Sequence, residues 1–164
     1  MNINKIINFR NISFGSSSAV ITSLAIVIGL SGTVNAKINI ITALLIIAIA
    51  DNVSDSFGIH VYQESECGKP NEVRRITFDN FIARFLITMV FVLFVFFISL
   101  NYAIVLSIIV GLSIIIILSY SIAKKQKINP YKEIFKHLAL AILVMFIGLI
   151  LRDLLLGFSS KLVK

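Results

Sequence analysis

The chain has 164 residues, of which 58% are hydrophobic and 14% charged, and its mean hydropathy is +0.98. Soluble domains contain about 45–50% apolar residues even when glycine is counted, so the composition excludes an ordinary soluble domain and predicts a single all-α integral membrane domain. The net charge of +7 does not indicate nucleic-acid binding, because no basic stripe is interleaved with aromatic residues, and the single Cys67 excludes an internal disulfide.

Five apolar runs come close to the roughly 20 residues that a helix needs to cross a bilayer core. They predict membrane helices over residues 14–34, 38–64, 80–100, 102–122 and 137–158. The second helix is expected to continue beyond the membrane as a polar helix. The two longest connections are predicted as loops at 65–79 and 123–136.

The first helix carries small and hydroxylated residues on one face, including Ser18, Thr22, Ala25 and Gly29. Such residues let helices approach closely and form hydrogen bonds across an interface. We expect a homodimer with this helix at its two-fold axis. The alternative interpretation is that the hydroxyl groups line a polar path.

The second helix carries two carboxylates, Asp51 and Asp55, which are four residues apart and therefore share a face. A charged side chain at the centre of a bilayer costs roughly 2.5–3.5 kcal/mol, so such groups usually face a partner helix, a cavity or an ion path. Two carboxylates this close disfavour double ionisation, and a divalent cation would relieve their repulsion and displace a shared proton.

The segment that follows mixes acidic and basic residues. Glu64, Glu66 and Glu72 either belong to a solvated loop with local ion pairs or form a carboxylate cluster that receives cations at the mouth of a path. His60 is one helical turn before Glu64 and is able to share a cation or a hydrogen bond with it. For His60 and His137, packing at a membrane boundary is the simpler interpretation. Oxygen-rich groups of this kind suit hard or borderline cations such as Mn²⁺, Fe²⁺ or Mg²⁺.

Lysine and arginine are distributed unequally between the two ends of the predicted helices. Three basic residues, Lys37, Lys161 and Lys164, lie at one end, with Arg152 near it. The other end holds eleven: Lys5, Arg10, Lys69, Arg74, Arg75, Arg84, Lys124, Lys125, Lys127, Lys132 and Lys136. Because basic residues accumulate on the cytoplasmic side, this count predicts a cytoplasmic N-terminus and an external C-terminus.

Three short stretches resemble the first two helices of the vacuolar iron transporter family, whose members follow roughly the patterns G-x-x-D-G-L, G-L-S-G and S-M-x-x-G-E-Y. The stretches are Phe14-Gly15-Ser16-Ser17-Ser18-Ala19-Val20, Gly29-Leu30-Ser31-Gly32 and Ser54-Asp55-Ser56-Phe57-Gly58. The resemblance implies five helices and a homodimer that exchanges Fe²⁺ or Mn²⁺ for protons at the dimer interface. It also implies a prokaryotic type of protein, located in the cell membrane.

Four positions depart from the family pattern. Ser18 occupies the place of the first-helix aspartate and Ala19 that of the glycine after it, while Ile47 and Asp55 replace a second-helix glutamate and methionine. On this reading Asp51, Asp55 and Ser18, with His60 and the three glutamates, are the candidate metal ligands. The cation is a substrate, and no permanently bound cofactor is expected.

Two functions from different classes follow from these residues. The first is a proton-coupled transporter of divalent cations, with a carrier or channel for another solute as a variant. The second is a scaffold or interaction protein of the same fold, in which Arg84, Arg152 or helix ends neutralise the two aspartates. No enzyme is expected, because the sequence holds no phosphate-binding glycine loop, HExxH or CxxC motif.

Overall fold

The computed structural model describes residues 3–66 and 68–162, with side chains described from residue 15 to 154, apart from residue 67, and at 156 and 157. Within these ranges all regular secondary structure is helical, and short turns connect the helices. The elements in order are α1 (Ile3–Gly29), α2 (Ala36–Ile46), η1 (Ile47–Asp51), α3 (Asn52–Ser65), α4 (Pro70–Phe97), α5 (Leu100–Gln126) and α6 (Pro130–Leu162). Because α2, η1 and α3 follow one another without a break, they form one long helix with a π-helical turn in its middle.

Four helices are long and apolar enough to cross a membrane, as an integral membrane protein requires: Ala36–Ser65, Pro70–Phe97, Leu100–Gln126 and Pro130–Leu154. The described apolar part of α1, Gly15–Gly29, is shorter. Large hydrophobic side chains are exposed along the four long helices, among them Ile49, Phe57, Phe97, Ile117 and Leu143. Apolar surface of this extent is typical of a face in contact with lipid.

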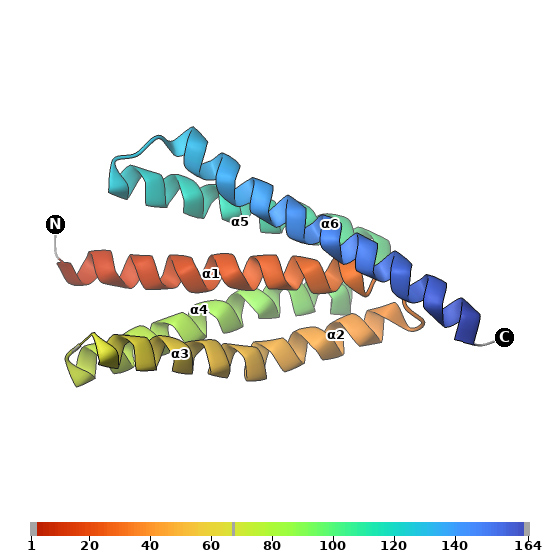
Figure 1. The fold of residues 1–164 in the computed structure, drawn as a ribbon, viewed down its shortest axis with the longest axis horizontal. Helices are drawn as coiled ribbons and strands as arrows, with labels where there is room; N and C mark the ends of the chain where they lie inside the picture. The colour runs from red at the N-terminus through yellow and green to blue at the C-terminus, as the bar shows by residue number, and fades with distance from the viewer. Residues whose placement is uncertain (1–2, 67, 163–164) are drawn as a thin grey trace.

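Helix α1 runs through the middle of the bundle (Figure 1), with α2, α3 and α4 on one side of it and α5 and α6 on the other. None of its described residues from 15 to 30 is exposed. Val20, Leu24 and Val27 are completely buried in a core that also includes Phe91 of α4 and Ile115 of α5. The two ends of the chain lie at opposite ends of the bundle (Figure 1).

The small-residue face of α1 is not reserved for a second copy of the chain. A Cβ atom added at Gly148 of α6 would lie 3.4 Å from the carbonyl oxygen of Ala25, and one added at Gly29 would lie 3.8 Å from the carbonyl oxygen of Gly148. These contacts show the close approach that small residues permit, here within one chain. Ala25 and Gly29 were expected to pack against a second copy of the chain, but they pack against α6 of the same chain. The homodimer itself stays a prediction.

The predicted loop at 65–79 is wrong for most of its length, because α4 begins at Pro70. Proline is well suited to the first position of a helix, where its missing N–H is not needed. Although the segment is polar, Val73 and Ile76 are 1% and 3% exposed. Val73 lies two turns and Ile76 one turn before Asn80 on the buried face of α4, and their burial stabilises this polar segment as a helix.

The other helix ends also differ from the prediction. The loop predicted at 123–136 shrinks to residues 127–129, because α5 continues to Gln126 and α6 starts at Pro130. The turn placed at residue 101 lies at 98–99, and α1 extends from Ile3 to Gly29 instead of from 14 to 34. Hydropathy marks the apolar part of a helix, and a helix that continues into water has no hydropathy signal at its end.

Candidate functional site

Among the side chains that the structure describes, Arg84 is the largest that is fully buried, and only 1% of it is exposed. It lies on the face of α4 that contacts α3 and α1. Buried charges in proteins are paired, because an isolated charge in a medium of low dielectric is very costly. The neighbours of Arg84 therefore define the polar centre of the bundle.

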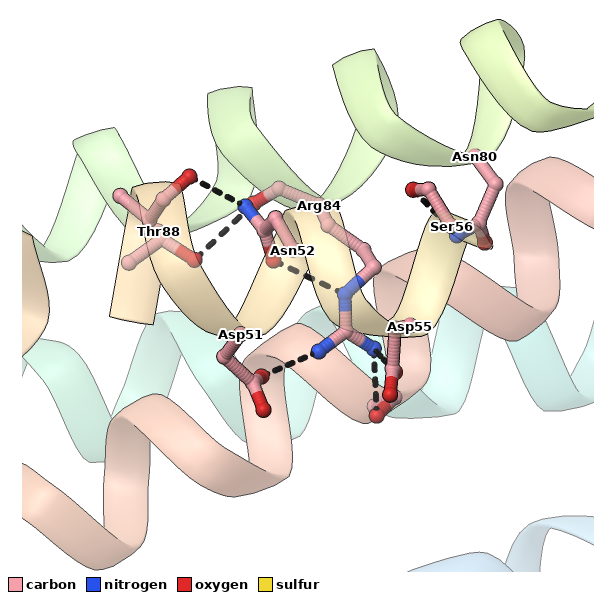
Figure 2. Close-up of polar contacts among 9 residues, drawn as sticks. Asp51, Asn52, Asp55, Ser56, Asn80, Arg84 and Thr88 are labelled. Carbon is pink, nitrogen blue, oxygen red and sulfur yellow. Dashed lines mark hydrogen bonds and ion pairs between the residues drawn. The ribbon is translucent and has the colours of Figure 1, made fainter. Parts of the chain in front are cut away.

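The guanidinium group of Arg84 is surrounded by oxygen atoms from two other helices (Figure 2). Its Nη2 donates to Oδ2 of Asp51 at 2.6 Å, and its Nη1 lies 2.5 Å from Oδ2 of Asp55. The Nε atom donates to Oδ1 of Asn52 at 2.9 Å, and Nη1 also donates to Oγ of Ser18 on α1 at 2.8 Å. One side chain of α4 thus connects three helices.

The two carboxylates differ from Arg84 in their access to the surroundings. The side chains of Asp51 and Asp55 are 43% and 40% exposed, against 1% for Arg84. Each carboxylate therefore binds the guanidinium on one side and is open on the other. Two negative charges face one positive charge, so one negative charge remains when both carboxylates are ionised.

A second layer of polar residues holds the site in place. Asn52 donates from Nδ2 to the carbonyl oxygen of Ala48 at 2.9 Å, so its Oδ1 is turned toward Arg84. The hydroxyl of Thr88 donates to the carbonyl oxygen of Arg84, and Asn80 donates to Oγ of Ser56 at 3.3 Å (Figure 2). Asn52, Asn80 and Thr88 are completely buried. The first bond fixes the amide group that contacts Arg84, the second lies within α4, and the third joins α4 to α3 beside the site.

Helix α1 approaches this layer at Gly15. A Cβ atom there would lie 2.5 Å from Oδ1 of Asn80 and 3.1 Å from Cγ of Arg84. Only glycine leaves room for α4 at this distance. The sequence Gly15-Ser16-Ser17-Ser18 therefore supplies both the close approach, through Gly15, and a hydroxyl group for Arg84, through Ser18.

The site lies deep along the helices. Asp51 follows Ala36, the first residue of α2, by fifteen residues. At 1.5 Å per residue this is about 22 Å from the end of the helix, and Asp55 lies about 6 Å further. A bilayer core is about 30 Å thick, so a membrane that begins near Ala36 contains both carboxylates.

The other predicted ligands do not join this site. His60 is bonded to Oγ1 of Thr77 through Nδ1 at 3.1 Å, and its Nε2 lies 3.4 Å from Oε1 of Glu64. Glu66 is exposed, and Glu72 lines a shallow pocket with Lys69 and Arg75. No three His, Cys, Asp or Glu side chains gather as a metal site anywhere in the described part of the chain. The structure thus unites Asp51, Asp55 and Ser18, and leaves His60, Glu64, Glu66 and Glu72 apart.

Sequence reasoning identified Arg84 only as one of several residues able to neutralise the aspartates, and it missed Asn52, Asn80 and Thr88. A signal was present, since Asn80, Arg84 and Thr88 follow each other at intervals of four in α4. On the neighbouring helix, Asn52 and Ser56 have the same spacing. Polar residues repeated at this interval lie close to one another on a helix surface.

Comparisons with known proteins add no family to this description. No family model matches the chain, and neither the curated proteins nor the solved structures contain a match. The resemblance to the vacuolar iron transporters therefore stays a prediction.

Proposed function

We propose that this protein is a membrane transporter that exchanges divalent cations of the Fe²⁺ or Mn²⁺ class for protons, with Asp51 and Asp55 as the exchanging groups. The observation that carries the proposal is the pair of carboxylates that share one buried guanidinium and are open on the opposite side. A structural ion pair needs only one carboxylate for each arginine. The second carboxylate gives the site a negative charge that attracts a cation or a proton.

The chemistry of the donors supports a hard or borderline cation. The four groups around the guanidinium offer oxygen atoms only: two carboxylates, the amide of Asn52 and the hydroxyl of Ser18. Oxygen ligands suit Mg²⁺, Mn²⁺ and Fe²⁺ better than soft ions such as Cu⁺. The same oxygen atoms now surround a cationic side chain, so they are already oriented toward positive charge.

In this proposal Arg84 competes with the transported cation. It neutralises one carboxylate and holds the pair in position when no cation is bound. A cation that arrives from the open side of Asp51 and Asp55 weakens their bonds to Arg84 and displaces any proton that they share. Since only one negative charge remains in the presence of Arg84, we expect weak binding, which allows the ion to leave again.

The experiment is uptake of Fe²⁺, Mn²⁺, Mg²⁺ and Ca²⁺ into proteoliposomes under an imposed pH gradient. Uptake of Fe²⁺ or Mn²⁺ that depends on the gradient is expected for the wild type and is expected to fall at least tenfold in Asp51→Asn and Asp55→Asn. Asp153→Asn is the matched control, because Asp153 is an exposed carboxylate that also pairs with an arginine, Arg152. Equal uptake in liposomes with and without the protein would contradict the proposal.

A second candidate function is a scaffold that transports nothing. It is favoured by the contacts of Arg84, which bind both carboxylates and connect α1, α3 and α4. Calorimetric titration with Mn²⁺ in two buffers of different ionisation enthalpy separates the two functions. Binding with proton release, lost in both Asn variants, supports transport, whereas the absence of any binding makes the scaffold the better description.

The homodimer belongs to the same proposal. The described side chains on the face of α1 that carries Ser18 and Thr22 are half-buried in one chain, so a second copy is able to cover them together with the open sides of Asp51 and Asp55. Crosslinking between cysteines introduced at Thr22 in two copies is the expected result. Crosslinking only through the lipid-facing side of α5 would reject this arrangement.

A further inference from the structure

A groove lies between α3 and α4, near the end of the bundle that carries most of the basic residues. Its volume is about 480 Å³, within the range of roughly 300–1,000 Å³ that is typical of ligand sites. The groove is separate from the Arg84 site. The two share only Ser56, which lines the groove and accepts the hydrogen bond of Asn80.

The body of the groove is apolar and accessible. It is lined by Val53 and Phe57 of α3 and by Phe78 and Phe81 of α4. Phe57 and Phe78 are 65% and 64% exposed, and Val53 is 54% exposed. Such aromatic and branched side chains form a surface suited to a hydrocarbon chain.

One end of the groove is polar. His60 and Arg74 line it there, and because α3 and α4 are antiparallel, both residues lie at the end where α4 begins. His60 is already engaged with Thr77 and Glu64. Arg74 donates to Oδ1 of Asn71 at 2.7 Å and contacts the carbonyl oxygen of Pro70 at 3.4 Å. It forms no ion pair with a carboxylate in the described part of the chain.

The groove is shorter than one half of a bilayer core. Seven residues separate Arg74 from Phe81 on α4, and seven separate Val53 from His60 on α3. Each interval is about 10 Å at 1.5 Å per residue, against about 15 Å for half of the hydrocarbon core. When one membrane edge lies near Ala36, the opposite edge falls about 30 Å along the helix, close to Phe57. Val53 then lies at the depth of the acyl chains, and His60 and Arg74 lie at the headgroup level.

We propose that this groove binds one anionic phospholipid, with an acyl chain against Phe57 and Phe78 and the phosphate group at Arg74. The apolar body suits an apolar occupant, and Arg74, which forms no ion pair with a carboxylate in the described part of the chain, offers a positive charge at one end of the groove. An anionic lipid has both parts in this order and at this spacing. Beside the start of α4, the positive charges of Lys69 and Arg75 are matched in number by the negative charges of Glu64 and Glu72, so Arg74 supplies the positive charge at the headgroup end of the groove.

The absence of tryptophan from the sequence permits a direct test. Phe78→Trp places a single fluorophore in the groove, and Phe97→Trp places one on an exposed site at the other end of α4. Each variant is reconstituted with a small fraction of brominated phosphatidylglycerol or brominated phosphatidylcholine. We expect the Phe78→Trp protein to be quenched by the anionic lipid at about one fifth of the concentration that the neutral lipid requires. No such preference is expected for the Phe97→Trp protein.

Two neighbouring arginines provide the matched control. In the Phe78→Trp background, Arg74→Gln is expected to abolish the preference for phosphatidylglycerol, while Arg75→Gln, which lies outside the groove, leaves it intact. Equal quenching by both lipids, or equal effects of the two substitutions, would overturn the proposal in favour of diffuse attraction to the membrane surface. Quenching that decreases as protein density in the membrane rises would also overturn it, because a second copy of the chain would then cover the groove.

Discussion

Replacing Arg84 tests the central claim that one buried charge holds three helices together. In Arg84→Met a flexible apolar side chain takes the place of a guanidinium that is 1% exposed. Asp51 and Asp55 then face each other without a counter-ion, and Asn52 and Ser18 each lose a donor. Removing one partner of a buried ion pair costs about 3–5 kcal/mol. Because the carboxylates are 43% and 40% exposed and can be hydrated, we expect a value near the lower limit, about 3 kcal/mol.

The assay is thermal unfolding of the purified protein in detergent, followed by circular dichroism. For a chain of this length, 1 kcal/mol corresponds to roughly 2–4 °C, so Arg84→Met is expected to lower Tm by about 6–12 °C. Arg75→Met is the matched control and should change Tm by less than about 2 °C, because Arg75 is exposed. The triple variant with Asp51→Asn and Asp55→Asn should recover at least half of the loss, since it also removes the uncompensated charges. A triple variant as unstable as Arg84→Met alone would refute this reasoning.

Two further predictions concern the glycines and the topology. Gly15→Ala should destabilise the protein, because its Cβ would lie 2.5 Å from Oδ1 of Asn80. Gly58→Ala, whose Cβ would have nothing within 4 Å, should stabilise the protein by about 0.5–1 kcal/mol. Thermal unfolding of each variant measures the change in Tm. An unchanged or higher Tm in Gly15→Ala would contradict the clash at Gly15, and a lower Tm in Gly58→Ala would contradict the open surroundings of Gly58. In a Cys67→Ser background, Gln126→Cys and Ser160→Cys should react with an impermeant thiol reagent from opposite sides of the membrane. Labelling of both from the same side would show that α6 does not cross the membrane and would reject the predicted topology.

The apolar runs predicted the helical architecture because hydrophobicity over some 20 residues depends on the chain alone. The positions of the helix ends were harder to predict. Residues 70–79 look like a loop in the sequence, and the burial of Val73 and Ile76 against a neighbouring helix makes them helical. The face shared by Asp51 and Asp55 was predictable from their spacing. Their common partner was not, because the contact with Arg84 joins residues about thirty positions apart.

The π-helical turn explains how one long helix packs both its buried apolar residues in α2 and its buried polar residues in α3 against the same neighbour, α4. The buried residues of the helix follow an interval of four: Ile40, Leu44, Ala48, Asn52 and Ser56 are all between 0% and 4% exposed. In a regular α-helix each interval of four turns the face by about 40°, so four intervals would rotate Ser56 about 160° away from Ile40.

The turn η1 (Ile47–Asp51) lies in the middle of this series and accommodates an additional residue. One residue corresponds to about 100° of rotation, so the residual drift from Ile40 to Ser56 falls to about 60°. The same α4 face can then contact apolar residues in α2 and amides or hydroxyls in α3. Because Asp51 ends the π-helical turn and Asp55 follows it, both aspartates come to flank Arg84 instead of turning toward lipid. π-turns are frequent at functional sites, and here the irregularity determines which side of the helix carries charge.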